Sequence, residues 1–495
     1  MQPKARPGFF PPLGRPGGLP HGGPNAREPS MSPPSAVAAM SSRQTLALAA
    51  MAAVAGLLVW PFSPVDSLVR AGCLTLLAIA LWTTGWLPPW LTALAFFTLG
   101  MIGKVAPAGV VFAGFASSAV WLVFSGAVLG EAMRHTGLAQ RLADRLAPAL
   151  CPSYARAVAG TTLFSAAMLF VMPSAMGRAM LLLPILASLA DRLGFAPGLR
   201  ARHGLILGGL FGTYLPATTV LPANIPNNVL VGSMESVLGV VPSYGAYFLL
   251  HFPILGALRT VLLIGLLVLL YRDGSSRPAR VAPAPREPAS LPQRRLGWLL
   301  AVSVALWSSD AWHHIPAAWV GMAAALACLY PGSGLLPADA FGKLRFEAIF
   351  YVAGIVSLGA VADASGLGAA LARQALDVLP LSPDAPGLAF ALLAGLATVV
   401  GLGVTLPGVP PVVTPLVPDL ARAVGWTPMA VAMTEVVGFS SVILPYQAPP
   451  LVVAIQSGYL PGRDVVRFCL LTSALTIFAL WPLDYWWWRW LGVVG

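Results

Sequence analysis

The sequence predicts an all-helical protein that crosses a membrane many times and consists of two related halves. Of its 495 residues, 57% are hydrophobic and only 9% are charged, whereas a soluble domain carries about 25% charged residues. Many apolar runs approach the roughly 20 residues that a helix needs to cross a bilayer. Prolines interrupt several runs, and they do so at corresponding places in the two halves. These features predict an integral membrane protein with broken helices.

The clearest apolar runs define the expected helices in chain order. None alternates apolar and polar residues as a transmembrane β-barrel would require. Some are short and need flanking residues to span the bilayer. The runs are Leu46–Trp60, Leu68–Trp86, Trp90–Ile102, Tyr247–Tyr271, Leu296–Trp307, Ala317–Tyr330 and Val466–Trp481.

The second half repeats landmarks of the first at a constant separation. Trp90 and Trp319 each follow prolines that open an apolar run, and Gly137 and Gly366 each begin an amphiphilic stretch expected at the membrane interface. Both pairs are separated by the same length of chain. A broken helix leaves N–H and C=O groups that hydrocarbon cannot satisfy, so they must face protein, water or a solute. Paired breaks in two halves are typical of secondary transporters.

Composition divides the chain into four segments. Residues 1–43 are rich in Pro, Gly and Ser and are predicted to form a disordered basic tail. Residues 44–271 and 296–495 are the two transmembrane halves, and residues 272–295 are an arginine-rich linker. The tail carries five basic residues against one acidic residue, and the linker carries six against two. The positive-inside rule therefore places both in the cytoplasm.

Motifs around the breaks resemble those of the divalent anion/sodium symporters. Pro173–Arg178 precedes Leu182-Leu183-Pro184-Ile185, and Thr405–Pro411 precedes Val417-Pro418. Later turns run from Pro222 to Asn228 and from Pro445 to Leu451. Members of that family carry Ser-Asn-Thr motifs and a proline-flanked turn at these places. The resemblance covers most of residues 66–493 and implies two inverted-topology repeats, about eleven transmembrane helices and two re-entrant hairpins. It also implies a homodimer in which a transport domain moves against a scaffold.

This arrangement places the linker and the C-terminus on opposite sides of the membrane. The arginine-rich linker should be cytoplasmic, and the family's crossings should bring Gly495 to the other side. Reporter fusions at residue 285 and at Gly495 will test the prediction. Activity of both reporters in the same compartment will contradict it.

The resemblance also assigns the substrate site to the breaks. Of the first triplet only Ser174 matches the family, because Ala175 and Met176 occupy the other positions, and no residue of the second triplet matches. Sodium prefers oxygen ligands, which most of these side chains lack, so proton coupling or exchange is expected in place of sodium coupling. The candidate substrate-binding residues are Ser174, Ala175, Met176, Gly177, Arg178, Asn224, Asn227, Asn228, Thr405, Gly408 and Gln447.

Two ionisable residues are candidates for ion coupling. Arg178 is expected at membrane depth, where a charge costs about 2.5 to 17 kcal/mol and marks a functional candidate. It binds an anion through its planar fork, serves a structural ion pair, or extends its charged end to the membrane surface. Glu435 lies in the last broken span of the second half. It is a proton-coupling carboxylate, the partner of Arg178, or an interfacial residue.

The asparagine cluster has two interpretations as well. Asn224, Asn227 and Asn228 can bind a ligand or cap the backbone of their turn. Gln447 occupies the position corresponding to Asn224 in the second half, which favours a shared role.

Other classes of function receive little support. The net charge of +11 comes without the aromatic and basic motifs of nucleic-acid binding. The four cysteines are scattered, so neither a zinc site nor a disulfide framework is indicated. Asp310, His313 and His314 lack a metal-site spacing and are interpreted as an interfacial cluster. No cofactor and no metal site are expected.

The leading hypothesis is a secondary active transporter of a small anion, carboxylate-like, that works by alternating access of the elevator type. A passive anion channel and a membrane-embedded enzyme are the alternatives. The expected partners are the solute, the lipid bilayer and a second copy of the chain. The expected location is the inner membrane of a bacterium, which the chain crosses several times.

Overall fold

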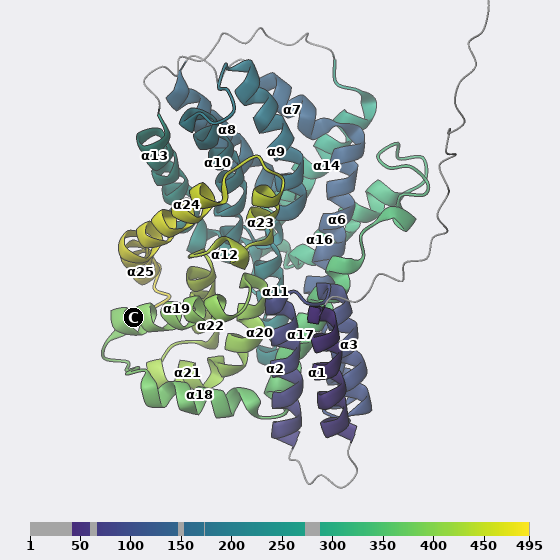
Figure 1. The fold of residues 1–495 in the computed structure, drawn as a ribbon, viewed down its shortest axis with the longest axis vertical. Coiled ribbons are helices and arrows are strands. Elements are labelled where there is room, and N and C mark those ends of the chain that lie inside the picture. The colour runs from purple at the N-terminus through teal and green to yellow at the C-terminus, as the bar shows by residue number, and fades with distance from the viewer. Residues whose placement is uncertain (1–41, 60–66, 147–152, 173, 273–287, 495) are drawn as a thin grey trace, which may run out of the picture. The chain divides into compact units, whose positions relative to one another are not determined.

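The computed structural model describes residues 42–59, 67–146, 153–172, 174–272 and 288–494 (Figure 1). These residues form helices joined by turns, and none of them lies in a β-strand, so the predicted all-helical fold is confirmed. Residues from Arg43 onward belong to one unit. Almost all of the predicted tail and most of the predicted linker lie outside the described residues.

The helices of the first half follow the predicted runs. Short helical segments separate several of them. The main helices are α1 (Ser42–Val59), α2 (Ser67–Thr84), α3 (Pro89–Ile102), α6 (Ser118–Thr136), α7 (Leu138–Leu146), α8 (Tyr154–Ala167), α9 (Ala175–Arg192), α10 (Arg200–Tyr214), α11 (Ile225–Leu238), α12 (Tyr244–His251) and α13 (Arg259–Tyr271).

The second half contains a comparable series. Its main helices are α14 (Leu291–Ser308), α16 (Ala317–Leu329), α17 (Glu347–Ala364), α18 (Leu367–Val378), α19 (Pro386–Gly403), α20 (Val409–Val413), α21 (Val417–Val424), α22 (Pro428–Phe439), α23 (Pro449–Gln456), α24 (Gly462–Leu475) and α25 (Trp481–Trp490). The two amphiphilic stretches are helices, as predicted, and correspond to α7 and α18.

Local sequence explains why these helices begin and end where they do. Pro89 occupies the first turn of α3, where its missing N–H costs nothing. Gly137 ends α6 with φ 67° and Gly366 precedes α18 with φ 76°. This left-handed conformation favours glycine because it has no Cβ. The two glycines that correspond between the halves therefore make the same kind of turn.

Helices at equivalent places in the two halves make equivalent contacts. In the first half α2 packs against α3 and α8 against α10, and in the second half α14 packs against α16 and α19 against α22. The halves also exchange partners, since α6 packs against α16 and α3 against α17. This reciprocal packing is what two related repeats produce. The inversion of one repeat relative to the other stays a prediction.

Glycine allows the closest of these contacts. A Cβ on Gly212 of α10 would lie 2.7 Å from the carbonyl oxygen of Thr162 in α8. A Cβ on Gly438 of α22 would lie 2.6 Å from the carbonyl oxygen of Ala394 in α19. Small residues at such positions let the backbones of membrane helices approach each other.

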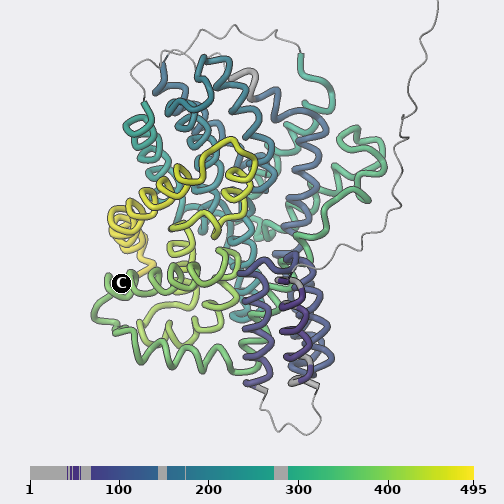
Figure 2. Tube along the Cα trace, viewed as in Figure 1, coloured from purple at the N-terminus to yellow at the C-terminus, as the bar shows by residue number. Residues whose placement is uncertain are grey.

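Each half ends in a long helical stretch with a π-helical segment inside it. In the first half η5 (Phe252–Leu258) joins α12 to α13, and in the second half η10 (Thr476–Leu480) joins α24 to α25. The two π segments contact each other. Figure 2 shows the C-terminal stretch, in yellow, lying across the first-half helices in blue and teal.

Several helices are apolar enough to cross a membrane. Within the described residues, four have sufficient length, and shorter apolar helices accompany them. The long ones are Tyr244–Tyr271, Glu347–Ala364, Pro386–Gly403 and Gly462–Trp490, and the shorter ones are Leu68–Thr84, Pro89–Ile102, Ala317–Leu329 and Pro428–Phe439.

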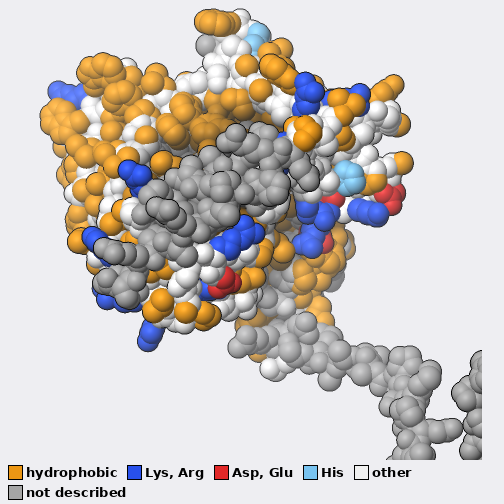
Figure 3. Space-filling view, turned by 90° about the horizontal axis from the view of Figure 1, so that it is seen from above, with side chains coloured by type: hydrophobic (Ala, Val, Ile, Leu, Met, Phe, Trp, Pro, Cys, Tyr) orange, Lys and Arg blue, Asp and Glu red, His pale blue; other side chains and the backbone are white. Residues whose placement is uncertain are grey.

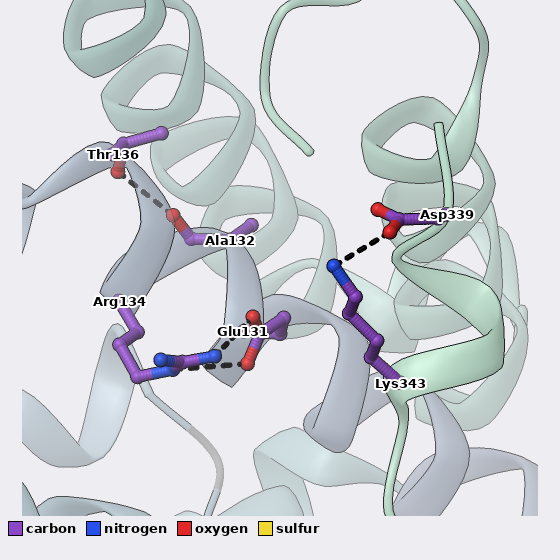
Figure 4. A network of polar contacts seen from close by, with 6 residues as sticks. All are labelled: Glu131, Ala132, Arg134, Thr136, Asp339 and Lys343. Atoms are coloured by element: carbon purple, nitrogen blue, oxygen red, sulfur yellow. Dashed lines mark hydrogen bonds and ion pairs between the residues drawn. The ribbon is translucent and has the colours of Figure 1, made fainter. Parts of the chain in front are cut away.

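Two ion pairs lie outside these apolar stretches. Figure 4 shows Arg134 paired with Glu131 near the end of α6, and Lys343 paired with Asp339 in the segment between α16 and α17. Lys343 Nζ lies 2.6 Å from Asp339 Oδ2. This hydrogen bond lowers the pKa of Asp339. Both side chains of the latter pair are exposed, as expected for a segment at the water-facing edge.

Candidate functional site

Four helix breaks bring the two halves together. In the first half, breaks precede α9 and α11, and in the second half they surround α20 and precede α23. The breaks pack crosswise, since α9 contacts α23 while α11 contacts α20 and the short turns on either side of it, η7 (Leu406–Gly408) and η8 (Thr414–Leu416). All four breaks therefore belong to one region built from both halves.

The first break is closed by its own residues. Ser174 precedes α9, and its hydroxyl accepts a hydrogen bond from the N–H of Gly177 at 3.2 Å. This is an N-cap, which satisfies one of the free N–H groups at the start of a helix. Ala175 is buried and Met176 is partly buried, and neither offers a side-chain oxygen. The surviving serine of the motif therefore acts on the backbone in this conformation.

Arg178 is fully buried and ties three segments of the first half together. Its Nε donates to Thr213 Oγ1 at 2.7 Å, and Nη2 donates to the carbonyl oxygens of Thr213 and Ala223, both at 3.1 Å. Nη1 donates to the carbonyl oxygen of Met172. Met172 and Ala223 lie just before the two breaks of this half. The guanidinium thus supplies donors to carbonyl groups that the broken helices leave free.

The asparagine cluster divides into two kinds of residue. Asn227 Nδ2 donates to the carbonyl oxygens of Ala217 and Val220, at 2.8 and 2.9 Å, so it holds the turn before α11. Asn224 and Asn228 are also buried, yet Asn224 Nδ2 and Asn228 Oδ1 have no hydrogen-bond partner among the residues described. Asn227 Oδ1 is likewise unpartnered within the described ranges. A buried polar atom without a partner is costly, so these atoms are the strongest candidates to meet water or a ligand.

Gln447 binds main-chain groups of its turn in the second half, as Asn227 does in the first half. Its Nε2 donates to the carbonyl oxygen of Gly401 at 2.7 Å, and its Oε1 accepts from the N–H groups of Ile443 and Leu444. All its contacts close the break before α23. The contacts of Gln447 and Asn224 differ in this conformation, because Gln447 lies within its turn whereas Asn224 directly precedes α11. A shared role in binding stays a prediction.

Thr405 and Gly408 lie at the other break of the second half. They line a small cavity of about 10 Å³ together with Trp82 of α2, Leu358 of α17 and other mostly apolar residues. Such a volume holds about one water molecule, whereas ligand pockets measure about 300–1,000 Å³. This break is therefore closed to any solute, and binding there requires movement.

Glu435 is fully buried in α22. Its Oε1 accepts a hydrogen bond from Thr414 Oγ1 at 2.9 Å, and Oε2 has no partner in the described part of the chain. Thr414 belongs to η8, and α11, η8 and α22 pack against one another. Glu435 is therefore buried among protein groups, and its role as a proton-coupling or an interfacial carboxylate stays a prediction. No ion pair joins it to Arg178 among the described residues, so the predicted pairing is absent from this conformation.

A second buried arginine was missed by the sequence analysis. Arg259 is fully buried, and its Nη1 donates to the carbonyl oxygen of Ser440 at 2.9 Å. Its Nη2 donates to the carbonyl oxygen of Leu215 and to Thr218 Oγ1. It therefore links a break of the first half to the end of α22 in the second half. An ionisable residue in the apolar run 247–271 was a sufficient signal to find it.

Two further buried polar residues lie near Arg259 in the last helices of the halves. Asp484 of α25 is fully buried with no hydrogen bond to either oxygen from the residues described, and His251 of α12 lacks a partner there for both ring nitrogens. The ring centroids of His251 and Trp488 are 5.6 Å apart. Asp484 interacts electrostatically with Arg259. Asp484 is thus a second fully buried carboxylate, in addition to Glu435, within the apolar helices.

Asp310 has a local structural contact. Its carboxylate accepts hydrogen bonds from the N–H groups of Tyr244 and Gly245 at the start of α12. A carboxylate at a helix N-terminus is favoured by the free N–H groups and by the helix dipole. In the described segments, no group of three or more His, Cys, Asp or Glu residues is arranged to hold a metal ion.

Comparison with known proteins now decides the family. The sequence profile of the CitMHS family, described as citrate transporter, matches residues 79–435, which is more than two thirds of the chain. The protein belongs to the CitMHS family. All of the candidate residues except Gln447 lie within the matched range. This CitMHS protein is therefore a membrane transporter and not an enzyme.

Individual relatives are distant. A "Membrane protein" from Cupriavidus necator is 24% identical to this CitMHS protein over 401 residues, which cover 78% of this chain and 77% of the relative. Among solved structures, the Alcanivorax borkumensis YdaH transporter gives a TM-score of 0.49 at 16% identity, with 92% of this chain and 100% of that chain covered. Neisseria gonorrhoeae MtrF, described as one of a class of antimetabolite efflux pumps, gives 0.49 at 14% identity, with coverage of 92% and 96%.

Proposed function

We propose that this CitMHS protein is a secondary active transporter that carries a small carboxylate-bearing anion, such as citrate, by alternating access. The observation that carries the proposal is the crosswise packing of the four breaks, with unpartnered polar atoms buried on both halves. Among the described residues, Asn224, Asn227 and Asn228 provide such atoms from the first half, and Glu435 provides one from the second. The Nδ2 of Asn224 is a donor that can bind a carboxylate oxygen, and the Oδ1 atoms of Asn227 and Asn228 are acceptors that can bind a hydroxyl group of the solute. The buried carboxylate of Glu435 can carry a proton.

The charge balance supports an anionic solute. Arg178 and Arg259 are fully buried at the breaks, Asp484 interacts electrostatically with Arg259, and Glu435 is buried in α22. The free N–H groups at the start of α9 and α11 add partial positive charge. Protonation of either carboxylate would leave a net positive site, which favours an anion. Binding of the anion and of a proton would then be coupled.

The closed cavity at Thr405 and Gly408 supports a moving site. Because it has no room for a solute, the breaks must separate from α2 and α17 to admit one. We propose that the breaks move as an elevator domain against a scaffold in a homodimer, in the inner membrane of a bacterium. The same proposal includes membership of this protein in the divalent anion/sodium symporters.

Transport should depend little on sodium. The triplet positions of the first break offer only the hydroxyl of Ser174, and that hydroxyl already caps α9. We expect proteoliposomes to take up citrate equally well when choline replaces sodium at fixed pH, and to show counterflow with citrate loaded inside. Loss of uptake in choline will contradict proton coupling, and ohmic current without counterflow will indicate a channel.

A further inference from the structure

A basic cleft contains none of the candidate site residues and is not explained by transport. Its volume is about 510 Å³, within the range of ligand pockets. It is formed where α10 and α24 begin and α13 ends. The lining residues are Gly198, Arg200, His203, Tyr271, Arg463, Asp464 and Arg467.

Packing beneath the cleft holds its three helices in place. The rings of Phe211 of α10 and Phe468 of α24 meet edge to face, with centroids 4.8 Å apart, and Tyr271 of α13 lies 6.2 Å from Phe468. His203 Nδ1 lies 2.7 Å from Asp464 Oδ2, which joins α10 to α24 directly. The cleft is therefore a built feature with a rigid aromatic floor.

The charges in the cleft are unbalanced. Three arginines face one carboxylate, Asp464, and His203 already occupies an oxygen of that carboxylate. Arg463 Nε lies 3.9 Å from the other oxygen of Asp464, beyond hydrogen-bond distance. Arg200 donates to the carbonyl oxygen of Leu270 at 2.6 Å. In the described residues, neither Arg463 nor Arg467 donates a hydrogen bond, and the one ion pair of Arg463 is the long contact with Asp464. Both guanidinium groups therefore keep donors for an oxyanion.

The position of the cleft indicates the source of that oxyanion. Arg272 and the linker follow Tyr271 directly, so the cleft lies on the face predicted to be cytoplasmic. Figure 3 shows basic side chains on this face among hydrophobic ones. Leu269 and Leu470 are exposed within one turn of the cleft residues, at 78% and 47%. Guanidinium groups above exposed leucines match a phosphate headgroup above its acyl chains.

We propose that this cleft binds the phosphate group of an anionic phospholipid of the cytoplasmic leaflet through Arg463 and Arg467, assisted by Arg200. Both α10 and α24 begin at this cleft, and the start of a helix favours an anion. The site is independent of the proposed transport function, and its test does not require transport.

The test measures thermal stabilisation of the purified protein in neutral detergent. Cardiolipin or phosphatidylglycerol should raise the unfolding midpoint, and phosphatidylcholine should not, because a ligand that binds only the folded state stabilises it. In the double variant Arg463→Gln/Arg467→Gln the apparent affinity for anionic lipid should fall about 30-fold, since each basic residue near the membrane surface contributes about fivefold. Without lipid the variant should unfold at the wild-type midpoint.

A matched double variant controls for general surface charge. Arg156 of α8 and Arg192 of α9 are exposed outside the cleft. They lie near the cleft, because a Cβ on Gly204 of α10 would touch both the hydroxyl of Tyr154 at the start of α8 and Tyr271 of the cleft. The rings of Tyr154 and Phe195, the latter close to Arg192, are 5.9 Å apart. Arg156→Gln/Arg192→Gln should keep the lipid effect. Equal loss in both double variants will overturn the proposal, and so will saturation of the effect by inorganic phosphate with no further gain from lipid, which would assign the cleft to a soluble anion.

Discussion

Replacing Arg178 with glutamine should lower the stability of the folded protein and abolish transport together. The guanidinium donates to three main-chain carbonyl groups and to Thr213 Oγ1, all buried. A buried acceptor that loses its donor costs about 1–3 kcal/mol, and glutamine cannot reach all of the acceptors. The loss should therefore be at least about 3 kcal/mol, measured as a lower thermal midpoint of the purified protein.

The thermal midpoint of Arg178 variants distinguishes a structural role of this arginine from direct binding of the anion. Arg178→Lys should recover only part of the stability, because an ammonium group lacks the planar fork that reaches both breaks. Arg156→Gln, at an exposed arginine of α8, should leave the midpoint unchanged. If Arg178→Gln unfolds at the wild-type midpoint but is no longer stabilised by citrate, the arginine binds the substrate as the sequence analysis expected.

Replacing Glu435 with glutamine should uncouple transport from protons. The variant keeps the shape of the side chain and the contact with Thr414, but it cannot release a proton. In proteoliposomes, uptake driven by a pH gradient should fall to the level of empty liposomes. Exchange of citrate for citrate should continue, because it needs no net movement of protons.

Asp484 provides the matched control for Glu435. It is the other fully buried carboxylate discussed above, and it lies in a different helix. Asp484→Asn should retain uptake driven by the pH gradient if Glu435 is the coupling residue. The reverse result, with coupling lost in Asp484→Asn and kept in Glu435→Gln, will transfer the role to Asp484 and its neighbour Arg259.

Much of the fold could be predicted from composition and spacing. Long apolar runs can only be helices in a membrane, because every backbone polar group must be satisfied within the chain. The constant separation of matching landmarks, such as Gly137 and Gly366, indicated the repeat, and both glycines take the left-handed conformation. What the sequence could not show is the exchange of partners between the halves, since this depends on tertiary packing.

The site was harder to predict than the fold. The positions of the breaks were found because proline and glycine mark them. The contacts of the polar residues were not found, since Gln447 and Asn227 satisfy backbone groups whose location depends on the path of the broken helix. Arg259 was missed because the apolar run Tyr247–Tyr271 was treated as a uniform span, and Asp484 was missed because it lies just beyond the end of the run Val466–Trp481. Single charges in such runs are functional candidates and need individual inspection.

The π-helical segments have a consequence for the angular phase of the two final helices. A π turn pairs each N–H with a carbonyl five residues earlier, so it accommodates one more residue than an α-turn. If the residues of η5 formed a regular α-helix, α13 would be rotated about the helix axis by about 100° for each residue that the π turn adds. Arg259 is the first residue beyond η5, and Asp484 is the fourth beyond η10. The π turns therefore determine that the side chains of Arg259 and Asp484 point into the protein. A regular period of 3.6 residues, continued through η5 or η10, would assign both residues to the wrong face of their helices.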